Sequence, residues 1–174
     1  MKMKRHLFIL MAICLGGLVA ISCNRENGDD NGGSGTGGNK KSTIQYQMKD
    51  SFKQNGQTLQ IFPYFHYNLK YVDATGKTVE VNNVSAPWNL PAFEVKAPFT
   101  AKIEGTIVYN ESELPETGTI IFGAVPNIHY IENGVVKDRD LNDAPVGQFS
   151  SKAQFLNFIS THPDRLTFTL EYTF

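Results

Sequence analysis

Apolar and polar side chains alternate along most of the chain after residue 42, with the period of two that is typical of half-buried β-strands. The alternation is cleanest in residues 99–109 and 166–174, and it is also present in 44–48, 65–71 and 93–97. Each of these segments would place one row of apolar side chains on one face of a sheet and a polar row on the other. The pattern therefore predicts short strands that bury one face.

Turn-forming residues separate these segments. Asn55-Gly56 and Asn133-Gly134 are signals for tight hairpin turns, because asparagine and glycine tolerate positive φ. Pro63 interrupts the aromatic run 58–72, which is therefore either an edge strand or two strands that meet at a bend. Residues 119–125 are apolar on both faces, as expected of a central strand in a sandwich. Together the segments predict about eight or nine short strands.

One helix is predicted after these strands. Ser151 and Gln154 match a capping box, and Phe155, Phe158 and Ile159 share one face at helical spacing. His162-Pro163 should end the helix, because the residue before proline is pushed out of the helical region. The predicted fold class is therefore mainly β: an antiparallel β-sandwich with one short helix near the C-terminus.

The N-terminal segment differs from the rest of the chain. Lys2, Lys4 and Arg5 precede Leu7–Ile21, an uncharged apolar run of 15 residues. A membrane span needs about 20 residues, so the run is typical of the central part of a secretory signal. An ordinary cleaved secretory signal and an uncleaved membrane anchor are the alternatives.

The residues that follow this run, Ala20-Ile21-Ser22-Cys23, resemble the lipobox of bacterial lipoproteins. The resemblance implies cleavage before Cys23 and attachment of acyl chains, palmitate among them, to its sulfur and amino group. Residues 1–22 would then be a lipoprotein signal peptide. The acidic residues Glu26, Asp29 and Asp30 resemble the export signal of Bacteroidota-type lipoproteins. This implies a lipid-anchored protein of the outer membrane that is periplasmic or surface-exposed.

Residues 23–41 would form the acylated cysteine and a linker. Residues 24–41 hold six glycines in 18 positions and no apolar side chain, so we expect a disordered coil. A glycine-rich coil of this length spans about 25 Å. The β-sandwich domain is then predicted over residues 42–174.

Composition limits what this domain can do. Without residues 1–22, 152 of the 174 residues remain, with 13 Lys and Arg against 17 Asp and Glu and a net charge of −4. That charge argues against nucleic acid as a partner. Cys14 would leave with the signal and Cys23 would be acylated, so no disulfide is expected. The length suits one domain, and we expect a monomer that is stabilised by its core.

Residues 64–109 resemble the Ig-like domains of small Bacteroidota lipoproteins. An aromatic strand, a glycine turn at Gly76, the pair Pro87-Trp88 and then paired strands carry this resemblance. The same pattern resembles small mycobacterial membrane proteins that accompany lipid exporters. The first resemblance implies an Ig-like sandwich, and we expect it to act as a non-catalytic module that binds a glycan or a protein. The second implies a structural or adaptor subunit of an envelope transport or assembly complex.

Catalytic and metal chemistry are not predicted. No serine stands in a nucleophile-elbow context, and His66, His129 and His162 are too far apart in sequence to suggest zinc. Residues 138–142 begin like a calcium loop, but Asp143 stands where glycine is needed and Phe149 where a bidentate glutamate belongs. We therefore expect no enzyme activity, no cofactor and no metal site.

The aromatic run provides the candidate binding residues, Tyr64 and His66. If Phe65 and Tyr67 face the core, strand alternation places Tyr64 and His66 on the opposite face. An aromatic ring beside polar groups suits a sugar or a peptide, because rigid rings provide contact area at low entropic cost. The alternative is that the predicted helix covers this face and that Tyr64 packs against it.

Overall fold

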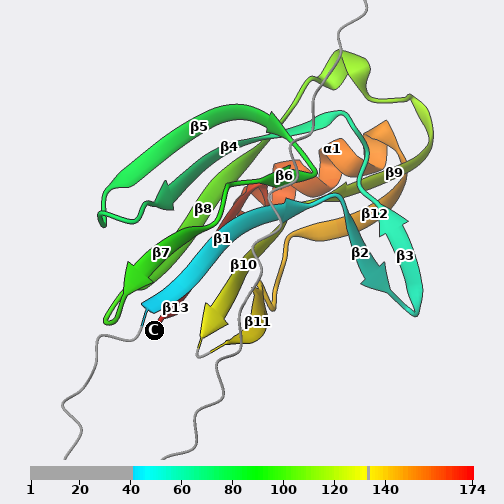
Figure 1. Cartoon of the computed structure of the whole chain (residues 1–174). Helices are drawn as coiled ribbons and strands as arrows, with labels where there is room; N and C mark the ends of the chain where they lie inside the picture. The colour runs from blue at the N-terminus through cyan, green and yellow to red at the C-terminus, as the bar shows by residue number, and fades with distance from the viewer. Residues whose placement is uncertain (1–40, 133) are drawn as a thin grey trace, which may run out of the picture. The chain divides into compact units, whose positions relative to one another are not determined.

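The computed structural model describes residues 41–132 and 134–174 (Figure 1). The predicted signal peptide, the lipidation site Cys23 and the linker up to residue 40 lie outside the described residues. The first described strand, β1, begins at Lys41. The strands and helices of this part are β1 (Lys41–Lys49), β2 (Ser51–Gln54), β3 (Gln57–Gln60), β4 (Phe65–Val72), β5 (Thr78–Ser85), β6 (Trp88–Asn89), β7 (Phe93–Lys96), β8 (Thr100–Tyr109), η1 (Glu111–Glu113), β9 (Thr117–Gly123), β10 (Val125–Glu132), β11 (Val135–Asp140), β12 (Val146–Ser151), α1 (Lys152–Thr161), η2 (Pro163–Leu166) and β13 (Thr167–Thr173).

Two antiparallel sheets form the sandwich. In one sheet the strand order is β11-β10-β1, and the free edge of β1 pairs with β7 near its start and with β6 near its end. The other sheet has the order β13-β8-β4-β5. Two smaller antiparallel pairs, β2–β3 and β9–β12, complete the described strands. The predicted mainly β, antiparallel sandwich with one short helix near the C-terminus is confirmed.

The core lies between the inner faces of the two sheets. Alternate residues of β1 and β4 are fully buried there, as the period of two requires. The hydroxyl of Tyr46 donates to the carbonyl oxygen of Val72 at 2.9 Å and accepts from the backbone N–H of Lys102 at 3.1 Å. The hydroxyl of Tyr67 donates to the carbonyl oxygen of Gly123 at 2.8 Å. These bonds satisfy two buried phenols that would otherwise destabilise the core.

The helix α1 closes one end of the core. The Ser151 hydroxyl accepts from the backbone N–H of Gln154 at 3.3 Å, as the capping box predicts. The reciprocal bond is displaced by one residue, because the Gln154 side chain accepts from the backbone N–H of Ser150 at 3.0 Å. Phe155 is fully buried, and its ring lies 5.5 Å from that of Phe65. The helix ends at Thr161, directly before His162-Pro163.

The aromatic run 58–72 is two strands that meet at a bend. Residues 61–64, with an exposed Pro63, separate β3 from β4. Asn55 and Gly56 adopt φ angles of 51° and 78° in the turn between β2 and β3, the left-handed region that a tight hairpin turn requires. Both predicted Asn-Gly signals therefore lie between paired strands, β2–β3 and β10–β11.

Candidate binding cleft

A cleft of about 550 Å³ lies between the β2–β3 hairpin and the connection from β11 to β12. Its volume falls within the range of about 300–1,000 Å³ that is usual for sites of small ligands. The lining combines apolar side chains with charged, hydroxyl and amide groups. The apolar residues are Phe52, Val125, Leu141, Ala144 and Val146, and the polar ones are Lys49, Ser51, Lys53, Thr58, Asp140 and Asn142.

The cleft exists because the β2–β3 hairpin is attached to the sandwich at its base. The backbone N–H of Ile61 donates to the carbonyl oxygen of Asp50 at 2.7 Å, and that of Phe62 donates to the carbonyl oxygen of Ile121 at 3.0 Å. Figure 1 shows β2 and β3 projecting from the end of β1. The space between this hairpin and the β11–β12 connection is the cleft.

A polar row on the outer face of the five-stranded sheet borders the cleft. The ammonium group of Lys49 lies 2.7 Å from the Asp140 carboxylate, which also accepts from the Asn127 amide at 2.9 Å. Asn127 is fully buried, and its carbonyl oxygen has no hydrogen-bond partner in the described part of the chain. Asp140 is therefore held by two neighbours and compensates the charge of Lys49.

Lys53 provides the cationic group of the cleft that is left available for a ligand. No ion-pair partner of Lys53 occurs among residues 41–132 and 134–174, and its side chain is exposed. Thr58 and Asn142 add a hydroxyl and an amide on the same lining. The cleft thus offers hydrogen-bond donors together with apolar lining residues such as Phe52 and Leu141.

In the segment that begins like a calcium loop, residues 138–142, the carboxylates of Asp138 and Asp140 already contact neighbouring side chains. Asp138 lies 3.0 Å from His129, and hydrogen bonding from this histidine lowers the pKa of the Asp138 carboxyl. Asp140 is held by Lys49 and Asn127 as described above. Across residues 41–132 and 134–174, no group of three or more His, Cys, Asp or Glu side chains is arranged to hold a metal ion.

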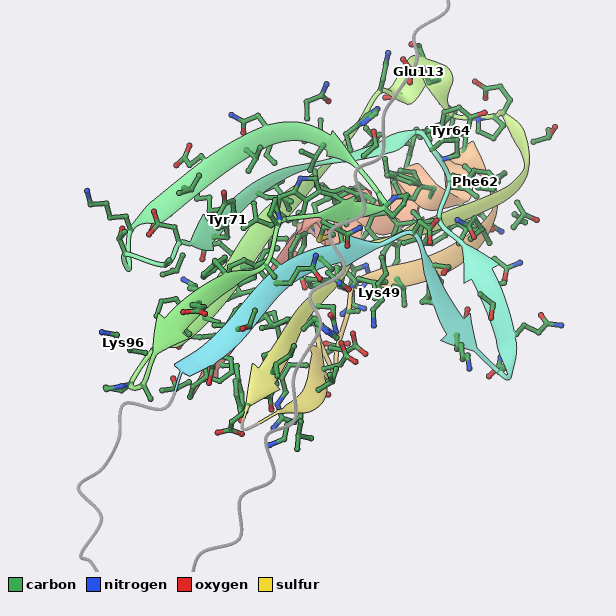
Figure 2. All side chains as sticks on the ribbon, in the orientation of Figure 1. Lys49, Phe62, Tyr64, Tyr71, Lys96 and Glu113 are labelled. Carbon is green, nitrogen blue, oxygen red and sulfur yellow. The ribbon has the colours of Figure 1, made fainter. Side chains whose placement is uncertain are left out.

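The sequence-predicted binding residues lie outside this cleft. Tyr64 is half-buried in the bend before β4, and its ring packs edge-on against Phe62 with centroids 5.9 Å apart; Figure 2 shows the two side by side. His66 is also half-buried, with its Nδ1 3.0 Å from the hydroxyl of Ser85. The helix packs on the side of β4 from which Phe65 projects. A binding role of Tyr64 and His66 stays a prediction.

Sequence reasoning missed the cleft residues except Asp140 and Asn142, which lie in the segment that begins like a calcium loop. The strands that border the cleft, β2 (SFKQ) and β12 (VGQFSS), lack the alternation that marks the core strands. For the β2–β3 side of the cleft, the Asn55-Gly56 turn was the sequence signal. It predicts a hairpin, but it does not predict that β2 and β3 form a two-stranded sheet apart from the two main sheets. The cleft depends on contacts between segments far apart in sequence, such as Lys49 with Asp140.

Comparison with protein-family models finds no match to this chain, and none of the curated proteins compared with it matches significantly. The described part of the chain, from residue 41 onward without residue 133, contains no helix whose length and apolar character would let it cross a membrane. The class that the fold defines is a mainly β, antiparallel sandwich with a cleft beside the β2–β3 hairpin.

Proposed function

We propose that this chain is a cell-envelope lipoprotein, acylated at Cys23 and anchored in the outer membrane, whose domain binds a glycan or protein ligand without catalysing a reaction. The observation that carries the proposal is the position of the cleft relative to the linker. The linker enters the domain at Lys41, the first residue of β1, whereas Lys49, the last residue of β1, lines the cleft. A strand of 9 residues spans about 30 Å.

This arrangement suits a tethered binding protein. An anchored domain would hold the start of β1 toward the membrane and present the cleft away from it. A two-sheet sandwich with binding residues at one end is the arrangement used by Ig-like domains, which supports the Ig-like resemblance of residues 64–109. An adaptor subunit would instead need a surface for a protein partner.

The chemistry of the cleft favours a sugar or an extended peptide. Phe52 provides a ring against which the apolar face of a sugar can pack. Lys53, Thr58 and Asn142 can donate hydrogen bonds to hydroxyl, carbonyl or carboxylate oxygens. The Lys53 ammonium group favours ligands that carry negative charge.

Two measurements test the two parts of the proposal. Labelled palmitate should enter the wild-type protein and not Cys23→Ala, and the labelled protein should fractionate with the outer membrane. For binding, titration with a panel of neutral and acidic oligosaccharides and peptides should shift the NMR signals of cleft residues. Phe52→Ala or Lys53→Gln should weaken that binding at least about tenfold, the effect expected of a contact worth about 1.4 kcal/mol.

Lys96→Gln is the matched control, because Lys96 is also an exposed lysine but lies at the other end of the sandwich. It should leave binding unchanged. A soluble, unlabelled wild-type protein would contradict the anchor. Ligand-induced shifts that cluster at Tyr64 and His66 would move the site to the sequence-predicted face. Hydrolysis of any oligosaccharide or peptide in the panel would contradict a non-catalytic domain.

A further inference from the structure

We propose that the end of the domain where β1 begins rests on an anionic phospholipid surface, and that Ile131, Val135 and Val136 insert among the lipid headgroups. We call these three residues the valine patch. The inference rests on the proposed anchor at Cys23, but it concerns a surface of the folded domain rather than the acyl chains.

The valine patch gathers most of the exposed apolar side chains of the domain. Four large apolar side chains are exposed in the described part of the chain, and three of them form the patch. Val135 is 55% exposed, Val136 57% and Ile131 37%, whereas the fourth, Val108, lies on β8. Ile131 and Val136 are paired across β10–β11, and Val135 is paired with Glu132. Apolar side chains therefore project from both faces of this hairpin end.

The patch lies next to the point at which the linker enters the domain. Ser42 is paired with Glu132 and Thr43 with Ile131, so the start of β1 lies directly beside the end of β10. Adjacent strands are about 4.8 Å apart, which places β11 about 10 Å from the linker entry. If residues 24–41 form the coil of about 25 Å that their composition predicts, this end of the domain would stay close to the membrane that holds Cys23.

Basic residues accompany the apolar ones. Lys96 of β7 is paired in register with the first residue of β1, and Figure 2 shows Lys96 at the end of the domain where β1 begins. Lys96 is exposed and has no ion-pair partner among residues 41–132 and 134–174. Lys137 follows the two valines and lies 2.8 Å from Glu132, whose charge it compensates. Lys96 on β7 and Lys137 on β11 therefore lie on either side of β1 and β10 at this end of the sheet. Lysines on the same end as exposed apolar side chains suit an anionic headgroup layer.

A second copy of the chain fits this surface less well. Two copies of the chain could pair their β11 strands in antiparallel orientation around a two-fold axis. One residue of β11 then faces the same residue of the other copy, and the positions before it face the positions after it. The longest such registers centre on Lys137 or Asp138 and place like charges opposite each other, which is destabilising. The lipid surface requires no such pairing.

The test measures how deeply the valine patch inserts into the bilayer, separately from whether the acyl anchor binds the protein to the vesicles. The acylated protein carrying Val135→Trp is reconstituted into vesicles of phosphatidylglycerol and phosphatidylethanolamine with brominated acyl chains. We expect quenching of the added tryptophan to exceed that of the native Trp88 at least twofold, and to weaken at high salt as lysine–headgroup attraction is screened. Gln57→Trp on the exposed β2–β3 hairpin is the matched control, which should show no quenching beyond that of Trp88.

The outcomes separate the two proposals. Flotation with the vesicles reports the anchor, whereas quenching at position 135 reports the patch. A protein that floats but shows equal quenching at positions 135 and 57 overturns the lipid-docking proposal and leaves the anchor intact. Failure of the protein to float with the vesicles contradicts the anchor. In the same sample, the quenching at position 135 relative to position 57 still shows whether the valine patch contacts lipid. A blue-shifted emission at position 135 without vesicles would indicate contact with a second copy of the chain, and would also overturn lipid docking.

Discussion

The interior of the sandwich and the cleft beside the β2–β3 hairpin are built from different kinds of sequence. The interior comes from strands with strict alternation, such as β4, in which Phe65, Tyr67 and Leu69 are buried. The cleft comes from short polar strands and a connection, and no large side chain of β2 is fully buried. The two regions meet at Val125, which lines the cleft and belongs to the buried core cluster.

The difference separates stability from recognition within one small domain. Burial of large apolar side chains is the main stabilising contribution to a fold, and here it is concentrated between the two sheets. Partly exposed side chains contribute less to folding and remain accessible to a ligand. Substitutions in the two regions should therefore have distinguishable effects on unfolding and on binding.

The largest expected effect is the loss of the Phe65 ring. Its centroid lies 5.4 Å from that of Phe122 and 5.5 Å from that of Phe155, so it connects β4, β9 and α1. Phe65→Ala should lower the free energy of unfolding by about 3–5 kcal/mol, because it removes buried apolar surface and leaves a cavity. Denaturant titration followed by circular dichroism measures this loss.

Phe52→Ala is the matched control for Phe65→Ala, since Phe52 is a half-buried ring in the wall of the cleft. It should cost about 1 kcal/mol, the centre of the distribution for single substitutions. If the two substitutions cost the same, the hairpin belongs energetically to the core and the contrast between the regions is wrong.

The alternating strands explain why so much of the fold could be predicted from the sequence. The segments 99–109 and 166–174 correspond to β8 and β13, which pair with each other along their lengths. The helix and its cap were also predicted, because helical spacing and the capping box are local signals. The pairing of strands was not predicted, since alternation identifies a buried face but does not identify the neighbour across the sheet.

The candidate site was much less predictable, and the reason is again physical. Lys49 and Asp140 form their ion pair across 91 positions of sequence, and no local pattern records such a contact. The prediction of Tyr64 as part of a strand face assumed that alternation extends through the bend before β4. In the structure β4 begins one residue later, at Phe65, and the Tyr64 ring packs with Phe62.

The next largest effect is a loss of folding stability at alkaline pH, and it comes from tyrosines in the interior of the sandwich. Burial raises the pKa of Tyr46 from 10.0 to about 12, and burial also raises the pKa of Tyr67. Above pH 10 the unfolded chain therefore loses these phenolic protons before the folded chain does. Stability should be unaffected below that pH and should fall as pH rises toward the folded-state pKa, by up to about 1.4 kcal/mol per pH unit for each tyrosine.

Denaturant titrations from neutral pH to about pH 12 measure this slope, and Tyr67→Phe is the informative variant. It should flatten the alkaline loss and cost about 1–2 kcal/mol at neutral pH, because the carbonyl oxygen of Gly123 loses its hydrogen bond from Tyr67. No tyrosine lines the cleft, so Lys53→Gln should leave the slope unchanged. Equal slopes in the wild type and Tyr67→Phe would show that the buried phenols do not control alkaline unfolding.

The smallest expected effect on stability is that of Tyr64→Ala, which tests where the boundary between interior and surface lies. Tyr64 is half-buried, so its truncation should cost less than about 1 kcal/mol, near the range of surface substitutions. If a glycan or peptide binds beside Tyr64 and His66, the same substitution should remove much of the binding, because aromatic contacts tend to dominate interface energies. Binding that survives Tyr64→Ala but is lost in Phe52→Ala would assign the ligand to the cleft. A loss of stability as large as that of Phe65→Ala would instead place Tyr64 within the core and exclude its face as a binding site.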